Sequence, residues 1–204
     1  MLAAIERTKD RLTDAGAASD AARTQIISAV MAYWAGHPGV AVSIVEKLLN
    51  YSILSPTGVI NWALVNNAGD TKGDALSRAY VYELVFNTVM KVTGRVRQVA
   101  RRRTQPEGMA DGTLEAEVRG MRELFRAIQD ALVSWASGSK DEMIEMEIGD
   151  GEGKSQRESL IRRWGERWLR AFSRRMAIEE AFLVEASKQA VVDETNGGEG
   201  SAAE

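Results

Sequence analysis

The sequence contains no cysteine and only one histidine, and these two scarcities exclude several kinds of chemistry. Without cysteine there are no disulfides, no thiolate metal ligands and no cysteine nucleophile. Without a second histidine, neither a catalytic triad nor a histidine-rich metal site can be assembled from this chain. His37 stands between Gly36 and Pro38, where we expect a turn residue between two helices. We therefore predict that the protein is not an enzyme and has no catalytic residues, metal site or cofactor.

Long apolar runs are also absent. No window approaches the roughly 18 uninterrupted apolar residues that a membrane span needs, and residues 2–16 lack the apolar core of a signal peptide. Phosphate-cradling GxxxxGK[ST] loops are missing, and the glycine clusters lie among acids, which repel phosphate. Four acids match no EF-hand spacing and are read as a solvated run: Asp141, Glu142, Glu145 and Glu147. These observations predict a soluble, intracellular chain without membrane association.

The residues that start and stop helices give a strong signal in this sequence. Three short apolar segments follow one another between residues 27 and 65. The first stops at Gly36 and Pro38, because glycine suits the left-handed position after a helix and proline cannot continue one. The third opens at Ser55 and Pro56, a hydroxyl N-cap followed by proline in the first turn. Helices this short must bury their apolar stripes against one another. The pattern predicts an all-α fold of stacked antiparallel helical hairpins, similar to HEAT and armadillo repeats.

Two longer periodic segments follow. Apolar residues recur mostly at steps of three and four over residues 76–104, and an unbroken heptad seam runs from Leu114 to Trp135. Together they predict a long antiparallel hairpin, which either projects from the stack or packs as an ordinary pair of core helices. A long helix or a kinked pair is expected from Arg157. The predicted parts are a weakly structured lead-in helix at 1–20, one helical-repeat domain at 21–192 containing the hairpin at 76–137 and an acidic mobile loop at 138–156, and a disordered tail at 193–204.

Basic residues are concentrated in two blocks. Residues 91–103 contain no acid, and residues 154–175 contain seven arginines against two glutamates. One reading is a basic face for RNA phosphates or for an acidic protein partner. The other, which we favour, is a solvated face that meets the acidic loop and the acidic stretch from Glu179 within the same molecule. The candidate RNA-phosphate or acidic-partner contacts are Arg95, Arg97, Arg101, Arg102 and Arg103.

Two tryptophans of the second block, Trp164 and Trp168, lie among arginines in a way that superficially resembles a base-stacking platform. Their four-residue spacing indicates instead that they share one helix face. We therefore expect both to be core anchors.

Four short motifs between residues 24 and 100 resemble a known family. They are a helix ending in Trp34 and followed by His37-Pro38, then Val45 to Leu48 (VEKL), Val59 to Trp62 (VINW) and Tyr82 to Leu84 (YEL). Together they resemble the third, carboxy-terminal helical domain of the large subunit of the nuclear cap-binding complex, in its fungal form. That family is related to the middle domain of the translation-initiation scaffold. Beyond residue 100 only the order of elements is similar.

The resemblance implies a nuclear scaffold that shuttles to the cytoplasm. Its expected partner is a small subunit with an RNA-recognition motif, which grips the 7-methylguanosine cap, so that capped RNA is held only indirectly. The large subunit of that family also recruits splicing, export and decay factors. Because the complete large subunit has three such domains, this chain is expected to correspond to part of one. The alternative is a generic helical-repeat protein–protein adaptor without an RNA role.

Overall fold

The computed structural model describes residues 20–66, 73–103, 111–137 and 151–197. Over these residues it contains six α-helices and one 3-10 helix: α2 (Asp20–Tyr33), α3 (Pro38–Asn50), α4 (Pro56–Leu64), η1 (Asp74–Ser77), α5 (Ala79–Arg103), α6 (Asp111–Ala136) and α7 (Gly151–Gly197). No strand occurs in these ranges. The all-α prediction is therefore confirmed. None of the described helices combines the length and the apolar content needed to cross a membrane.

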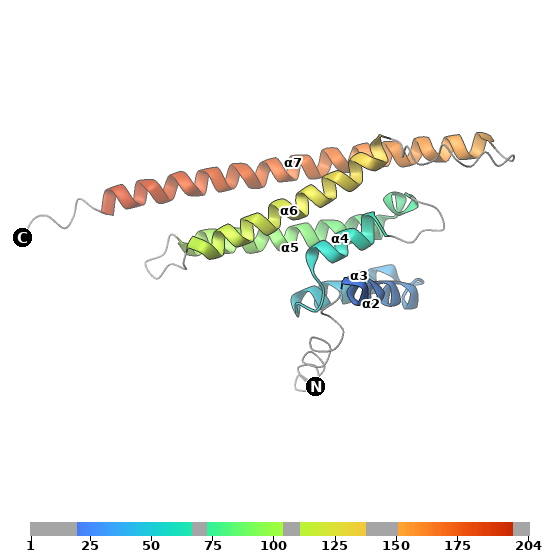
Figure 1. Cartoon of the computed structure of the whole chain (residues 1–204), viewed down its shortest axis with the longest axis horizontal. Helices are drawn as coiled ribbons and strands as arrows, with labels where there is room; N and C mark the ends of the chain where they lie inside the picture. The colour runs from blue at the N-terminus through green and yellow to red at the C-terminus, as the bar shows by residue number, and fades with distance from the viewer. Residues whose placement is uncertain (1–19, 67–72, 104–110, 138–150, 198–204) are drawn as a thin grey trace, which may run out of the picture.

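The helices form a stack with α2 and α3 at one end and α7 at the other (Figure 1). α2 contacts α3 and α4, α3 contacts α5, and α4 contacts both α5 and α6. The long helices α5, α6 and α7 run alternately in opposite directions, and α6 lies against α7. The hairpin of α5 and α6 thus packs between the short helices and α7 and does not project from the stack.

The start of α4 follows the predicted cap. Ser55 is extended, its side-chain oxygen accepts a hydrogen bond from the amide of Gly58 at 3.1 Å, and Pro56 is the first helical residue. The hydroxyl satisfies one of the amides that a helix start leaves without an intrahelical partner. Proline fits the first turn because its missing N–H is not needed there.

The turn between α2 and α3 differs in detail from the expectation. Pro38 opens α3, and His37 precedes it as an exposed turn residue without a side-chain capping bond, as expected for a turn. Gly36 does not take the left-handed conformation predicted for it. The turn is closed instead by the His37 amide, which donates to the carbonyl of Trp34 at 2.8 Å. A hydrogen bond of the 3-10 type therefore ends α2 without a left-handed glycine.

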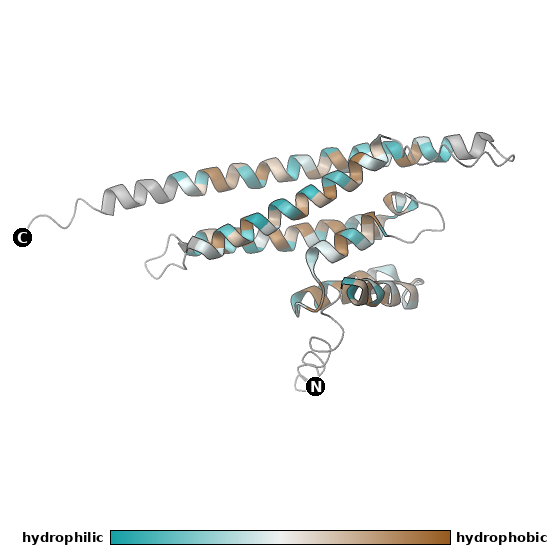
Figure 2. Ribbon diagram, viewed as in Figure 1, coloured by the Kyte–Doolittle hydropathy of each residue, from teal (hydrophilic) through white to brown (hydrophobic). Residues whose placement is uncertain are grey.

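The apolar seams of α5 and α6 form the centre of the core. Apolar and polar residues alternate along both helices (Figure 2). The middle of the α6 seam is fully buried, and its two ends, at Leu114 and Trp135, are partly buried against the same cluster. The buried members are Met121, Phe125, Ile128 and Leu132. The heptad reading of this segment is confirmed.

α7 is one continuous helix from Gly151 to Gly197, not a kinked pair. It begins before the expected start at Arg157 and continues into the segment expected as a tail. Leu160, an apolar residue near the start of this helix, is 47% exposed. α6 ends at Ala136, and the end of α6 lies next to Gly165 of α7. The expectations for residues 1–19, 138–150 and 198–204 lie outside the described residues.

Candidate basic surface

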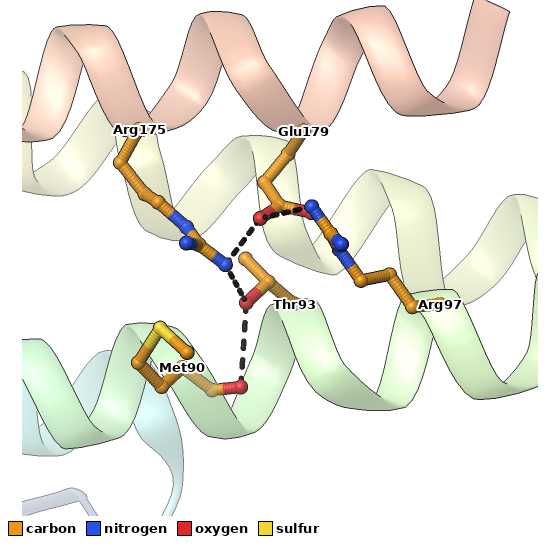
Figure 3. Close-up of polar contacts among 5 residues, drawn as sticks. All are labelled: Met90, Thr93, Arg97, Arg175 and Glu179. Carbon is orange, nitrogen blue, oxygen red and sulfur yellow. Dashed lines mark hydrogen bonds and ion pairs between the residues drawn. The ribbon is translucent and has the colours of Figure 1, made fainter. Parts of the chain in front are cut away.

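The five candidate arginines lie in the second half of α5, but the structure gives them different environments. Arg97 points into the molecule toward α7, where it meets the carboxylate of Glu179 (Figure 3). Arg95 pairs through Nε with Oε1 of Glu117 on α6 at 2.8 Å. Arg101 and Arg102 are exposed, and the side chain of Arg103 is not among those described. The block is therefore divided and is not one continuous face.

Glu179 is the centre of a buried ion cluster that joins α5 to α7. Its side chain is 1% exposed, and Arg97 donates to both carboxylate oxygens, at 2.7 Å from Nε and 3.1 Å from Nη2. Arg175, one turn before Glu179, brings Nη2 to 2.5 Å from Oε1. A buried carboxylate needs such partners because burial without them strongly disfavours the charged form.

Two further contacts fix the arginines of this cluster. Arg175 Nη2 also lies 3.5 Å from Oγ1 of Thr93, and that hydroxyl donates to the carbonyl of Met90 at 3.3 Å (Figure 3). The guanidinium of Arg97 lies over the ring of Phe182, 4.7 Å from its centre. A cation over an aromatic face is attracted by the ring quadrupole. Arg97 is thus held by two groups of its own chain, the Glu179 carboxylate and the Phe182 ring.

A second charged contact joins α6 to α7. Arg122 donates to both carboxylate oxygens of Glu180, from Nε and from Nη2, each at 2.7 Å. This hydrogen bonding holds the pKa of Glu180 below its usual value and that of Arg122 above it. On α5, Lys91 donates to the side chain of Asn50, and its pKa is lowered mainly by burial. The side chains of Arg122 and Lys91 thus make contacts between helices of the same chain.

The sequence predicted that basic residues pair with the acidic stretch from Glu179. Such pairs are present at Glu179, with Arg97, and at Glu180, with Arg122. The sequence reasoning missed Glu117 and also Asp74, which receives Arg157 in a forked contact. Both acids lie outside the acidic segments that the sequence singled out, and periodicity alone does not set how far one antiparallel helix slides along another. Whether Arg101 to Arg103 contact RNA stays a prediction.

The second basic block presents an exposed stripe on α7. Its members recur at steps of four, three and four, which places them on one helix face: Arg163, Arg167, Arg170 and Arg174. Arg170 lies 3.8 Å from Glu166 in an exposed pair. Trp168 is 2% exposed, with its ring edge-on to Tyr82 at 5.0 Å, which confirms its prediction as a core anchor. Trp164 is half-buried and packs against the core cluster.

The described residues contain no group of three or more histidine, aspartate and glutamate side chains that could hold a metal ion.

A family model described as MIF4G like matches residues 1–181 of the chain. The chain belongs to the MIF4G-like family. This is a non-catalytic family of scaffold domains.

A curated relative of this MIF4G-like domain is nuclear cap-binding protein subunit 1 of Schizosaccharomyces pombe. The two are 27% identical over 94 residues, which make up 46% of this chain and 11% of that protein. The aligned part is thus a small portion of the relative. No solved structure matches the chain.

Other polar side chains of the MIF4G-like domain also join helices. The indole N–H of Trp62 donates to Oγ of Ser28 at 2.9 Å, which links α4 to α2. The indole N–H of Trp135 donates to the carbonyl of Leu64 at 3.2 Å, which links α6 to α4. Buried indoles need such partners, because an unmade hydrogen bond costs more than a made one gains. These contacts hold the stack together, as a scaffold requires.

Proposed function

We propose that this MIF4G-like chain acts as a scaffold domain of a nuclear cap-binding complex large subunit. In this role it supports a small subunit with an RNA-recognition motif, and that subunit binds the 7-methylguanosine cap of RNA polymerase II transcripts. Surfaces of the stack recruit splicing, export and decay factors, and the protein works in the nucleus and shuttles to the cytoplasm. The observation that carries the proposal is the alignment with the Schizosaccharomyces pombe nuclear cap-binding subunit.

The architecture supports a scaffold role in a second way. Each described helix is tied to its neighbours by buried apolar contacts and by polar contacts that span elements, such as the Glu179 cluster. A stack fixed in this manner offers rigid surfaces to partners, and rigid surfaces lose less conformational entropy on binding. The cap itself then needs no pocket in this chain, because the small subunit holds it.

The test uses the tagged full chain, purified from its own cells and applied to a 7-methyl-GTP resin. We expect a small protein with an RNA-recognition motif to co-purify. We also expect free 7-methyl-GTP, but not GTP, to release the complex. The matched control is the same chain produced alone in bacteria, which should pass through the resin and be retained only after the small subunit is added.

Three results would count against the proposal. They are retention of the chain alone, the absence of any RNA-recognition-motif protein, and release by GTP as readily as by 7-methyl-GTP. Co-purification of vesicle or transport components, unaffected by the cap analogue, would favour the generic helical-repeat adaptor instead.

A further inference from the structure

A groove lies between α7 and the start of α5, next to η1. In this region α7 contacts η1, and Figure 1 shows where these elements lie. Its volume is about 370 Å³, and aromatic side chains from both helices line it: Tyr82, Trp164 and Trp168. Pockets that hold drug-sized ligands span about 300–1,000 Å³, so this groove suits one large side chain better than an extended ligand.

Among the described residues that line the groove, the charged side chains are two arginines, Arg78 and Arg167. Arg78 Nη1 donates to the hydroxyl of Tyr80 at 3.0 Å, which fixes its fork beside the groove. Arg167 is exposed and is also a member of the α7 arginine stripe, with Arg163 one turn before it. An anionic group seated in the groove therefore has guanidinium donors on more than one side.

The aromatic rings are not arranged for base stacking. Stacking needs an open ring face. The guanidinium of Arg167 lies 5.4 Å from the ring centre of Trp164 and occupies that face. Trp168 is nearly fully buried, between Tyr82 and Phe172. The walls thus offer ring edges and aliphatic carbon, which favour an apolar side chain over a nucleobase.

We propose that this groove docks an acidic peptide segment of a partner protein. One large apolar or aromatic side chain of the segment enters between Tyr82 and Trp164, and flanking carboxylates bind Arg78 and Arg167. An apolar anchor with charged neighbours is the arrangement in which a buried side chain gives affinity and the charges give specificity. The inference goes beyond the proposed function, since it concerns a second partner and holds with or without cap recognition.

Fluorescence polarisation with defined probes tests the proposal on the full chain. The main probe is a labelled twelve-residue peptide with one central tryptophan among aspartates and glutamates. Matched probes replace the tryptophan by serine, or every acid by its amide, and a labelled twelve-nucleotide oligouridylate tests RNA. We expect saturable binding of the main probe and at least about tenfold weaker binding of both altered peptides.

Variants then locate the site. Arg167→Glu should weaken the main probe at least about tenfold, and Ala171→Trp should do the same by filling the groove, in whose lining Ala171 is an exposed residue. The matched control is Arg162→Glu, which makes the same charge change at an exposed position of α7 outside the lining. It should change binding less than about threefold. Circular dichroism and thermal unfolding confirm that each variant folds.

Four outcomes overturn the proposal. They are no saturable binding of the main probe, equal binding of the serine probe, equal losses in Arg167→Glu and Arg162→Glu, and tighter binding of oligouridylate with loss in Arg167→Glu. The last would make the groove a nucleic-acid site. A fifth outcome also overturns it: if the probe binds only after Glu142, Glu145 and Glu147 are changed to glutamine, the acidic segment of the chain itself is the occupant and the assignment to a partner fails.

Discussion

Replacing Glu179 by alanine should destabilise the fold strongly. The carboxylate holds Arg97 through two hydrogen bonds and Arg175 through a third contact, and it is 1% exposed. Its removal leaves two guanidiniums facing each other across a small cavity. The change therefore removes the attraction and exposes the repulsion of like charges at the same place.

The size of the effect follows from the burial of the three partners. Removing one member of a buried ion pair costs about 3–5 kcal/mol. Arg97 and Arg175 keep 31% and 25% of their side-chain exposure, so water can solvate them in part, and the low end applies. For a chain of this size, about 3 kcal/mol corresponds to a fall in Tm of about 6–12 °C. Arg97→Lys keeps the charge but cannot form the fork, so about half of that loss is expected, near 1.5 kcal/mol.

Thermal and urea unfolding followed by circular dichroism measure these differences. The control is Glu158→Ala, at an exposed glutamate of the same helix, for which a change within about 0.5 kcal/mol is expected. If Glu179→Ala unfolds within about 2 °C of the wild type, or together with Glu158→Ala, the cluster does not join α5 to α7 energetically and the reasoning is wrong.

Three further changes test other parts of the fold. Gly73→Ala should cost about 3 kcal/mol by thermal unfolding, because Gly73 has φ 86° and an added Cβ would lie 3.3 Å from the Trp135 ring. Ser55→Ala should cost about 1 kcal/mol, since it removes the N-cap bond of α4. Glu180→Gln should lower stability by at most about 1 kcal/mol at pH 7, and by progressively less as the pH falls below 4.5, because Arg122 lowers the folded pKa of Glu180.

The sign of the last effect is fixed by the direction of the shift. A carboxyl whose folded pKa lies below its ordinary value of 4.5 stabilises the fold fully above that value. The contribution is lost as the pH falls through the folded pKa. A Glu180→Gln penalty that grew on acidification would contradict the assigned pair. For the other two changes, Ser55→Thr should be almost neutral, since threonine also caps. Gly94→Ala should raise stability by about 0.5–1 kcal/mol, because Gly94 lies inside α5 with open space around its Cβ position.

The features that could be predicted from sequence are those set by neighbours along the chain. The cap at Ser55 depends on the amide three residues later, and the α6 seam depends on steps of three and four. The all-α class and the antiparallel order of α5 and α6 follow from such local patterns and a short connection. Patterns among neighbouring residues are therefore sufficient to predict most of the helices.

The features that could not be predicted depend on how the helices slide past one another. The sequence left a long helix or a kinked pair open from Arg157, and α7 is one continuous helix. At Gly165 the missing side chain allows the backbone of α6 to approach, since an added Cβ would lie 3.3 Å from the Ala136 amide nitrogen. Close packing there overrides the low helix propensity of glycine. The partners of Arg97 and Arg95 depend on the same register, so the charge pattern alone left two readings open.

That register also decides how an RNA role of the α5 block has to be tested. Replacing all five arginines together would remove Arg97 from Glu179 and destabilise the fold, so lost RNA binding would have two explanations. Arg102→Ala with Arg103→Ala leaves the cluster intact. If these side chains contact phosphates, the affinity for single-stranded RNA should fall, and the slope of log Kd against log salt should shrink by about 0.7 for each lost contact. The charge-matched control is Arg162→Ala with Lys188→Ala, which removes two exposed positive charges from α7. An unchanged slope in the Arg102 and Arg103 variant would leave the α5 block as a set of charges that serves only the fold.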